Sequence, residues 1–170
     1  MAYLMQSGYG QLEINNCAFR RDGRIEAQCK LGTDFNNAVA QNGMVLAVDN
    51  TTRTLSFPTG SDALLALNYS AEHIYDERTP GLKNFALGKK DFLPRLGYLS
   101  VGDKFTTNTV NLGSDTFANI TVGDVFKPGT DGFWVADAST PVGQIQAKVV
   151  EKTTMPDGQP ALKFQIIKTI

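Results

Sequence analysis

The sequence predicts an all-β fold, either a barrel or a sandwich of antiparallel strands with long loops. Gly, Thr and Asn are frequent, and Leu, Ala and Glu are not concentrated in any window of helical period. Short alternating or apolar runs recur between clusters of turn residues. The phrase Val-Gly-Asp-x-Phe occurs at residues 101–105 and again at 122–126, and each copy is typical of a turn that leads into a strand.

The 170 residues suit one domain with an ordinary hydrophobic core. We expect residues 1–14 to form an extended, flexible N-terminal arm that carries Tyr3 and Tyr9. This segment either orders only against a partner or is a frayed terminus. Residues 15–170 form a single β domain, in which two similar β units, about 15–92 and 93–170, can be distinguished.

The first predicted element is a hairpin over residues 16–29 that turns at Arg21-Asp22-Gly23. With Gly23 in a left-handed conformation, Phe19 would face Ile25 on the buried side. Cys17 and Cys29 would share that side, offset by one residue pair. With two cysteines and no histidine in a ligand-like spacing, we expect free core thiols rather than a disulfide or a metal site.

Strands are predicted over residues 44–49, 53–58 and 63–69, and the first of them is apolar enough to be buried on both faces or to close a barrel. In the second half we expect strands over 98–101, 105–110, 120–126 and 133–136. A long hairpin then joins 143–152 to 161–168 through the turn 155–159. The two halves match in pattern: Gly43 matches Gly123, and the run 64–69 matches 145–150.

Residues 70–92 are the least regular segment, and long excursions of this kind usually make surface contacts. His73 with Asp76 and Glu77 invites a metal or acid–base interpretation. We prefer an ordinary solvated cluster, because His73 is the only histidine of the chain. The candidate partner contacts are therefore Tyr3, Tyr9, His73, Tyr75 and Arg78.

The aromatic residues allow a second hypothesis. Trp134, Tyr69 and Tyr98 on a β surface could stack on sugars, as in a carbohydrate- or receptor-binding module of a fibre or a cell-surface assembly. Their inward-alternating positions favour core packing instead. We expect no enzyme, because no nucleophile elbow and no paired acids are found, and we expect no cofactor and no metal.

The charge balance gives no support for a nucleic-acid partner. Sixteen basic and seventeen acidic residues give a net charge of −1, and no basic block occurs. The first residues lack the features of a signal peptide, and no run approaches a membrane span. We therefore expect synthesis in the cytosol and no membrane partner.

Three stretches resemble small virion proteins of tailed bacteriophages, specifically the capsid decoration or cement class. They are Lys89–Leu96 with Val101–Val110, then Asp131–Trp134, then Gly143–Val149. The resemblance covers about the second half of the chain and the strand from Asn42 to Leu46. It implies an all-β barrel that binds the major capsid protein, forms homo-oligomers on the shell and is localised in the virion after synthesis in the host cytoplasm. It implies no fixed functional residues.

Overall fold

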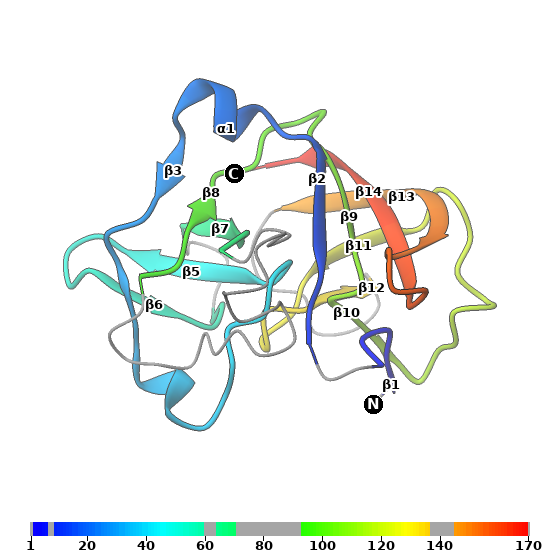
Figure 1. The fold of residues 1–170 in the computed structure, drawn as a ribbon, viewed down its shortest axis with the longest axis horizontal. Helices are drawn as coiled ribbons and strands as arrows, with labels where there is room; N and C mark the ends of the chain where they lie inside the picture. Colours follow the sequence, from blue (N-terminus) through cyan, green and yellow to red (C-terminus); the bar gives the residue numbers. More distant parts are fainter. Residues whose placement is uncertain (1, 7–8, 60–63, 71–92, 137–144, 170) are drawn as a thin grey trace.

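The computed structural model describes residues 2–6, 9–59, 64–70, 93–136 and 145–169. These residues form two β-sheets that pack against each other (Figure 1). The all-β prediction is confirmed, and the architecture is a sandwich of two sheets rather than a closed barrel. Each sheet contains one parallel pair among its described strands, which a purely antiparallel arrangement would not have.

The small sheet is drawn on the left of Figure 1. Its strands are β3 (Ile25–Glu26), β4 (Lys30–Leu31), β5 (Val45–Asp49), β6 (Thr54–Ser56), β7 (Leu65–Asn68) and β8 (Leu96–Gly97). They lie in the order β3-β8-β7-β5-β6-β4, and a short 3-10 helix, η1 (Thr33–Asn36), follows β4. As predicted, β5 is buried on both faces: Val45 and Ala47 join one hydrophobic cluster, and Leu46 and Val48 join the other.

The large sheet lies on the right of Figure 1 and includes the chain's N-terminal strands. Its strands are β1 (Ala2–Tyr3), β2 (Leu12–Asn16), β9 (Lys104–Thr107), β10 (Val110–Gly113), β11 (Val125–Pro128), β12 (Trp134–Ala136), β13 (Gln146–Thr154) and β14 (Pro160–Lys168). The order is β1-β10-β12-β11-β13-β14-β9-β2. The long hairpin predicted at the C-terminal end is confirmed as β13 and β14.

The two sheets share one topology once β1 and β2 are set aside. The remaining strands of the large sheet lie in the order β9-β14-β13-β11-β12-β10, so each strand of the small sheet has a counterpart six strands later in the chain. The directions agree as well, including the single parallel pair, which is β4 with β6 and β10 with β12. We call β3 to β8 the first unit and β9 to β14 the second unit.

The register between strands agrees too. Leu31 is the Cα partner of Leu55 in the first unit, as Val110 is of Trp134 in the second. Likewise, Val45 is the Cα partner of Leu67, as Val125 is of Lys148. Glycines with positive φ precede equivalent strands by two residues: Gly23 and Gly102 before β3 and β9, Gly43 and Gly123 before β5 and β11. Since register fixes which face each side chain occupies, residues can be compared one by one between the units.

The units stack with corresponding faces pointing the same way. Leu46 of the first unit corresponds to Phe126 of the second, yet Leu46 lies in the outer hydrophobic cluster and Phe126 in the cluster between the sheets. The opposite face of the first unit, with Ala47 and Leu67, packs into the cluster between the sheets. The corresponding face of the second unit bears polar residues, and we call it the open face.

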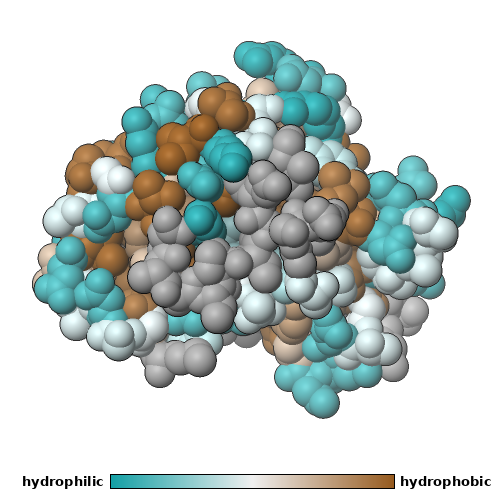
Figure 2. Space-filling model, turned by 180° about the vertical axis from the view of Figure 1, so that it is seen from behind, coloured by the Kyte–Doolittle hydropathy of each residue, from teal (hydrophilic) through white to brown (hydrophobic). Residues whose placement is uncertain are grey.

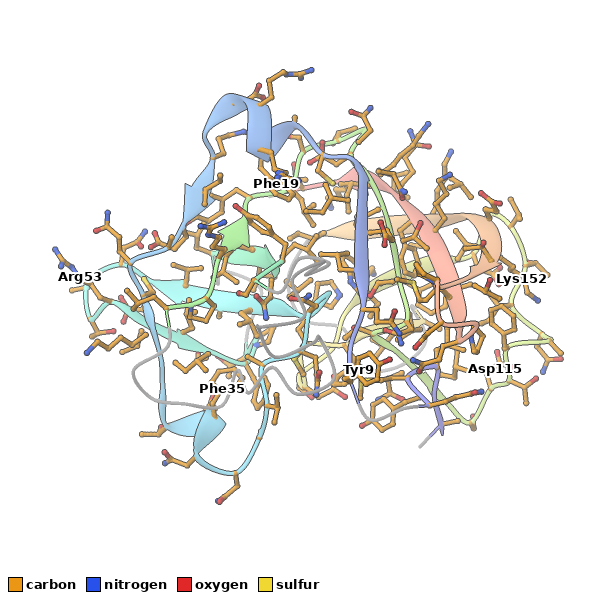
Figure 3. All side chains as sticks on the ribbon, viewed as in Figure 1. Tyr9, Phe19, Phe35, Arg53, Asp115 and Lys152 are labelled. Atoms are coloured by element: carbon orange, nitrogen blue, oxygen red, sulfur yellow. The ribbon has the colours of Figure 1, made fainter. Side chains whose placement is uncertain are left out.

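A helix replaces the hairpin predicted over residues 16–29. Helix α1 (Ala18–Asp22) ends at Gly23, whose φ of 70° is the left-handed conformation expected there, and its N–H donates to the Phe19 carbonyl. Phe19 points from α1 into the core (Figure 3) and lies against Gly97, where a Cβ would collide with its ring. The strands next to α1 pair with distant partners, β2 with β9 and β3 with β8, so the local hairpin gives way to tertiary pairing.

The described part of residues 1–14 lies on the large sheet. β1 pairs with β10 at one edge and β2 pairs with β9 at the other, and neither strand has a counterpart in the first unit. Leu4 is buried in the cluster between the sheets. For these residues the edges of the chain's own sheet supply the hydrogen-bond partners.

Both copies of the repeated phrase form the predicted turn before a strand. In each, the aspartate N–H donates to the carbonyl three residues earlier, and an aspartate carboxylate oxygen accepts from the N–H of that same residue. Gly102 and Gly123 have φ of 95° and 103°. The strand predicted over 105–110 is interrupted, however, because β9 ends at Thr107 and β10 begins at Val110.

Candidate functional site

Tyr3 lies on β1 and is partly exposed. Its ring packs on Phe133 at a centroid distance of 4.8 Å, and its hydroxyl donates to the Asp131 carboxylate at 3.5 Å. Partial burial raises the pKa of Tyr3, and the charge of Asp131 raises it further. Tyr3 is thus anchored at the edge of the large sheet, with part of its ring available for contact.

Tyr9 is held by a different carboxylate, that of Asp157 in the turn between β13 and β14. The hydroxyl donates to Asp157 Oδ2 at 2.7 Å, and this hydrogen bond is the main reason that the pKa of Tyr9 is raised. The same oxygen accepts from Gln11 Nε2 at 2.7 Å and from Gln159 Nε2 at 2.6 Å. Desolvation would raise the pKa of Asp157, but these hydrogen bonds outweigh it and lower the pKa to about 2.

The hydrogen bonds around Asp157 continue into the interior. Gln11 N–H donates to Asn108 Oδ1, and the Thr107 hydroxyl donates to the Gln11 carbonyl. Gln159 Oε1 accepts from Asn108 and from the backbone N–H of Gln6. This network explains why the strand is interrupted between β9 and β10: the buried side chains there form hydrogen bonds with the N-terminal segment. The role of the network is structural, because its polar groups form hydrogen bonds with one another.

The other three predicted contact residues, His73, Tyr75 and Arg78, lie outside the described residues, as do Asp76 and Glu77. Among the described residues, no group of three or more His, Cys, Asp or Glu side chains could hold a metal ion. No described helix has the length and apolar character that a bilayer crossing requires.

The aromatic residues of the carbohydrate hypothesis are largely enclosed. Trp134 is fully buried and its indole N–H donates to the Gly43 carbonyl at 3.0 Å. Tyr69 is buried against Phe19, with ring centroids 5.1 Å apart. Tyr98 is only half-buried. Core packing, which the alternation favoured, is therefore confirmed for Trp134 and Tyr69, and neither presents a ring face to a ligand.

The two cysteines are free and buried, as predicted, but they lie in different clusters, so the expectation that they share one face is wrong. Burial raises the pKa of Cys17 to about 12, with a contribution from the charge of Asp103. Burial likewise raises the pKa of Cys29 to about 11. Thiols with such pKa values carry almost no thiolate at neutral pH and are poor nucleophiles.

Exposed hydrophobic side chains are scattered. Among the described residues, the exposed large hydrophobic side chains are Tyr3, Ile25, Val39, Leu64, Leu93, Val101, Val122 and Ile167. On the side shown in Figure 2, the coloured hydrophobic surface forms separate patches among hydrophilic residues. Val101 and Val122 are the most exposed of these, at 64% and 66%, and they occupy the same position in the two copies of the Val-Gly-Asp-x-Phe phrase.

The open face of the second unit is a polar surface that spans several described strands. Lys104, Lys127, Lys148, Lys163 and Gln165 alternate with core residues on β9, β11, β13 and β14, and all are half-buried. Towards β2 the face contains a shallow hollow of about 470 Å³. Its lining residues include Glu13, Asn15, Thr106, Glu151 and Lys163. Lys163 pairs with Glu151 at 3.3 Å, and Thr106 donates to Asn15 at 2.8 Å.

A smaller cavity of about 250 Å³ lies where the units meet. Its lining combines the apolar residues Leu64, Leu65, Leu99 and Ile145 with Arg24, Tyr98, Ser100 and Thr169. Arg24 is already in contact with Asp22 at 3.7 Å. The cavity could accept a small apolar group, but Arg24, the cation among its described lining residues, is paired.

The open face is the best candidate for a contact surface, and the sequence signalled only part of it. The alternation of residues 143–152 places Gln and Lys outward, as expected for β13. That β9, β11 and β14 bring further lysines to the same face depends on a strand order that no local pattern contains. Comparison with protein-family models, with curated proteins and with solved structures finds no match for this chain.

Proposed function

We propose that this chain is a virion structural protein that decorates a bacteriophage capsid and stabilises it by many identical non-covalent contacts with the shell. The observation that carries the proposal is the stacked pair of units with an open polar face. A double layer of sheets sharing one hydrophobic cluster is a stiff body, and the open face offers a broad surface for a partner protein. The sequence resemblance supports the same class.

The mechanism would be linkage through repeated weak binding. A protein that binds only the assembled, expanded lattice stabilises that lattice by an amount that grows with the free concentration of the protein relative to its Kd. Copies that contact several shell subunits at once, or one another, add avidity without new kinds of contact. The major capsid protein would be the partner, and neighbouring copies of this chain would form the homo-oligomer around a symmetry position of the shell.

The test is co-sedimentation with empty shells assembled from the major capsid protein encoded in the same genome. We expect saturable binding at a fixed ratio to shell subunits, together with a higher temperature of shell disassembly. Unassembled capsid protein serves as the control and should bind less. Absence of the chain from the shell pellet, at concentrations where it remains monodisperse, would contradict the proposal.

A further inference from the structure

The fold explains every shared residue of the repeated phrase Val-Gly-Asp-x-Phe except the valine. Each glycine has the positive φ of the turn, and each aspartate carboxylate accepts a backbone N–H that closes it. Phe105 and Phe126 are fully buried in the cluster between the sheets. Val101 and Val122, by contrast, are 64% and 66% exposed. We call these two residues the valine pair.

The turn itself does not require a valine. Each valine is the second residue of a four-residue turn, between the residue whose carbonyl accepts the aspartate N–H and the glycine. Proline is common at that position when glycine follows. One exposed valine would need no explanation, because isolated apolar side chains are normal on protein surfaces. Two valines at the same turn position, with nearly the same exposure, indicate a shared role in binding.

The backbone around the two turns has a local two-fold symmetry. Gly102 N–H donates to the Ile166 carbonyl of β14 at 2.9 Å, and Ile166 N–H donates back to the aspartate carbonyl of the turn at 2.9 Å. Gly123 makes the same exchange with Val149 of β13, and both of its hydrogen bonds are 2.8 Å long. Because β13 and β14 are antiparallel neighbours, a two-fold axis between them exchanges the two turns.

The strand register gives the position of this axis. Lys148 and Gln165, which precede the two residues bonded to the turns, are Cα partners, so the axis passes between them and perpendicular to the sheet. It exchanges β9 with β11, since Lys104 pairs with Gln165 as Val125 pairs with Lys148. These two strands are three strand spacings apart, or about 14 Å. An axis perpendicular to a sheet preserves its two faces, so both turns lie at the same height relative to the sheet.

We propose that the two residues of the valine pair enter the same apolar recess on two identical protein subunits that are related by a two-fold axis. Under the proposed function, on which this inference rests, these subunits are neighbouring copies of the major capsid protein. The recess is apolar because a valine side chain offers neither charge nor hydrogen bonds. The partner is symmetric because two copies of one surface present equivalent recesses about a two-fold axis.

The turns suit this contact because they are held in place before binding. Each is closed by hydrogen bonds to its own aspartate and is tied to the neighbouring strand by two more. Little conformational freedom is therefore lost when a valine is buried by a partner. Two linked contacts of this kind bind more tightly than either contact alone.

Co-sedimentation with the empty capsid shells tests the valine pair. We expect Val101→Ser and Val122→Ser to weaken shell binding by the same factor, roughly tenfold or more, because each removes one of two linked contacts. The matched control is Val39→Ser, which replaces a valine that is 43% exposed between η1 and β5 and should bind shells as the wild type does. Unchanged urea midpoints in all three variants would exclude unfolding as the cause.

Site-directed cross-linking tests the symmetry of the contact. Val101→Cys and Val122→Cys are labelled in separate samples with a photoactivatable maleimide, which should not react with the buried thiols of Cys17 and Cys29. After irradiation of the labelled chains on shells, mass spectrometry identifies the attached peptides. We expect both labels on the same segment of the capsid protein. Attachment to two different segments would overturn the proposal.

Shell binding also separates this inference from the proposed function. Serine variants that bind shells as the wild type does would refute the valine pair while the proposed function stands. A loss of binding in only one of the two serine variants would refute the two-fold arrangement in the same way. A wild-type chain that binds no shells would overturn both.

Discussion

At the scale of single residues, Asp157 ties the N-terminal segment to the hairpin of β13 and β14. One carboxylate oxygen accepts three side-chain hydrogen bonds, from Tyr9, Gln11 and Gln159, and two of these partners are far away in the sequence. Hydrogen bonds to a charged acceptor stabilise more than neutral ones, although solvent at this exposed turn weakens them.

We predict that Asp157→Asn lowers the free energy of unfolding at neutral pH by about 1 kcal/mol, or roughly 2–4 °C in Tm. Because the pKa of Asp157 falls from 3.8 to about 2 on folding, its contribution is present above pH 4 and is lost as the pH falls towards 2. Thermal unfolding of both proteins from pH 7 to pH 2 should show the difference vanish. The control is Asp115→Asn, because the Asp115 carboxylate accepts hydrogen bonds only from Thr116 and Asn119. In this variant residues 9–12 should be as well protected from hydrogen exchange as in the wild type.

Alanine substitutions at two glycines with nearly equal φ would distinguish the cost of backbone strain from the cost of steric crowding. Gly43 and Gly158 have φ of 85° and 86°, but a Cβ on Gly43 would collide with the Thr107 and Thr109 hydroxyls, whereas a Cβ on Gly158 would meet open space. We predict that Gly158→Ala costs about 1 kcal/mol, from the left-handed backbone alone, and that Gly43→Ala costs roughly 2–4 kcal/mol. Urea unfolding of both variants measures this, and equal losses would show that the space around Gly43 does not matter.

At the scale of elements, the two Gly-Asp turns differ in the groups that donate hydrogen bonds to their aspartate carboxylates. Asp103 is buried and accepts from Ser100 N–H and from Ala18 N–H at the start of α1. Asp124 accepts only within its own turn, from the N–H and the hydroxyl of Thr121. The same phrase therefore closes a turn in both places and in one of them also positions a helix.

We predict that Asp103→Ala lowers the free energy of unfolding by roughly 2–3 kcal/mol and Asp124→Ala by about 1 kcal/mol. The larger loss has a specific signature, faster hydrogen exchange in α1, because only Asp103 reaches that helix. Chemical denaturation with residue-resolved exchange would measure both effects. Equal losses in the two variants would mean that the bond to Ala18 contributes nothing.

At the scale of the whole molecule, one face of a shared topology has two opposite environments. Leu67 and Lys148 occupy the same place in the first and second units, since each lies opposite the equivalent residue of the central strand. Leu67 is fully buried between the units, and Lys148 is half-buried on the open face. The difference in environment, and not the local strand geometry, determines which residue each position tolerates.

We predict that Leu67→Lys lowers the free energy of unfolding by roughly 4 kcal/mol or more, because it buries a charge without a partner. The reciprocal change Lys148→Leu should alter stability by no more than about 0.5 kcal/mol. Urea midpoints at neutral pH measure both. A Leu67→Lys protein as stable as the wild type would show that the units do not pack through this face.

The sequence by itself determined the strand class, the two Gly-Asp turns, the doubly buried β5, the terminal hairpin and the free thiols. These follow from side-chain periodicity and turn chemistry within a few residues, which is the range over which local sequence acts. The sheet pairing of β1 and β2, the helix in place of the first hairpin and the polar open face were decided only by the tertiary structure. Each depends on a pairing between distant segments, β2 with β9, β3 with β8 and β9 with β14, and such pairings are selected by burial and register across the whole chain rather than by any local pattern.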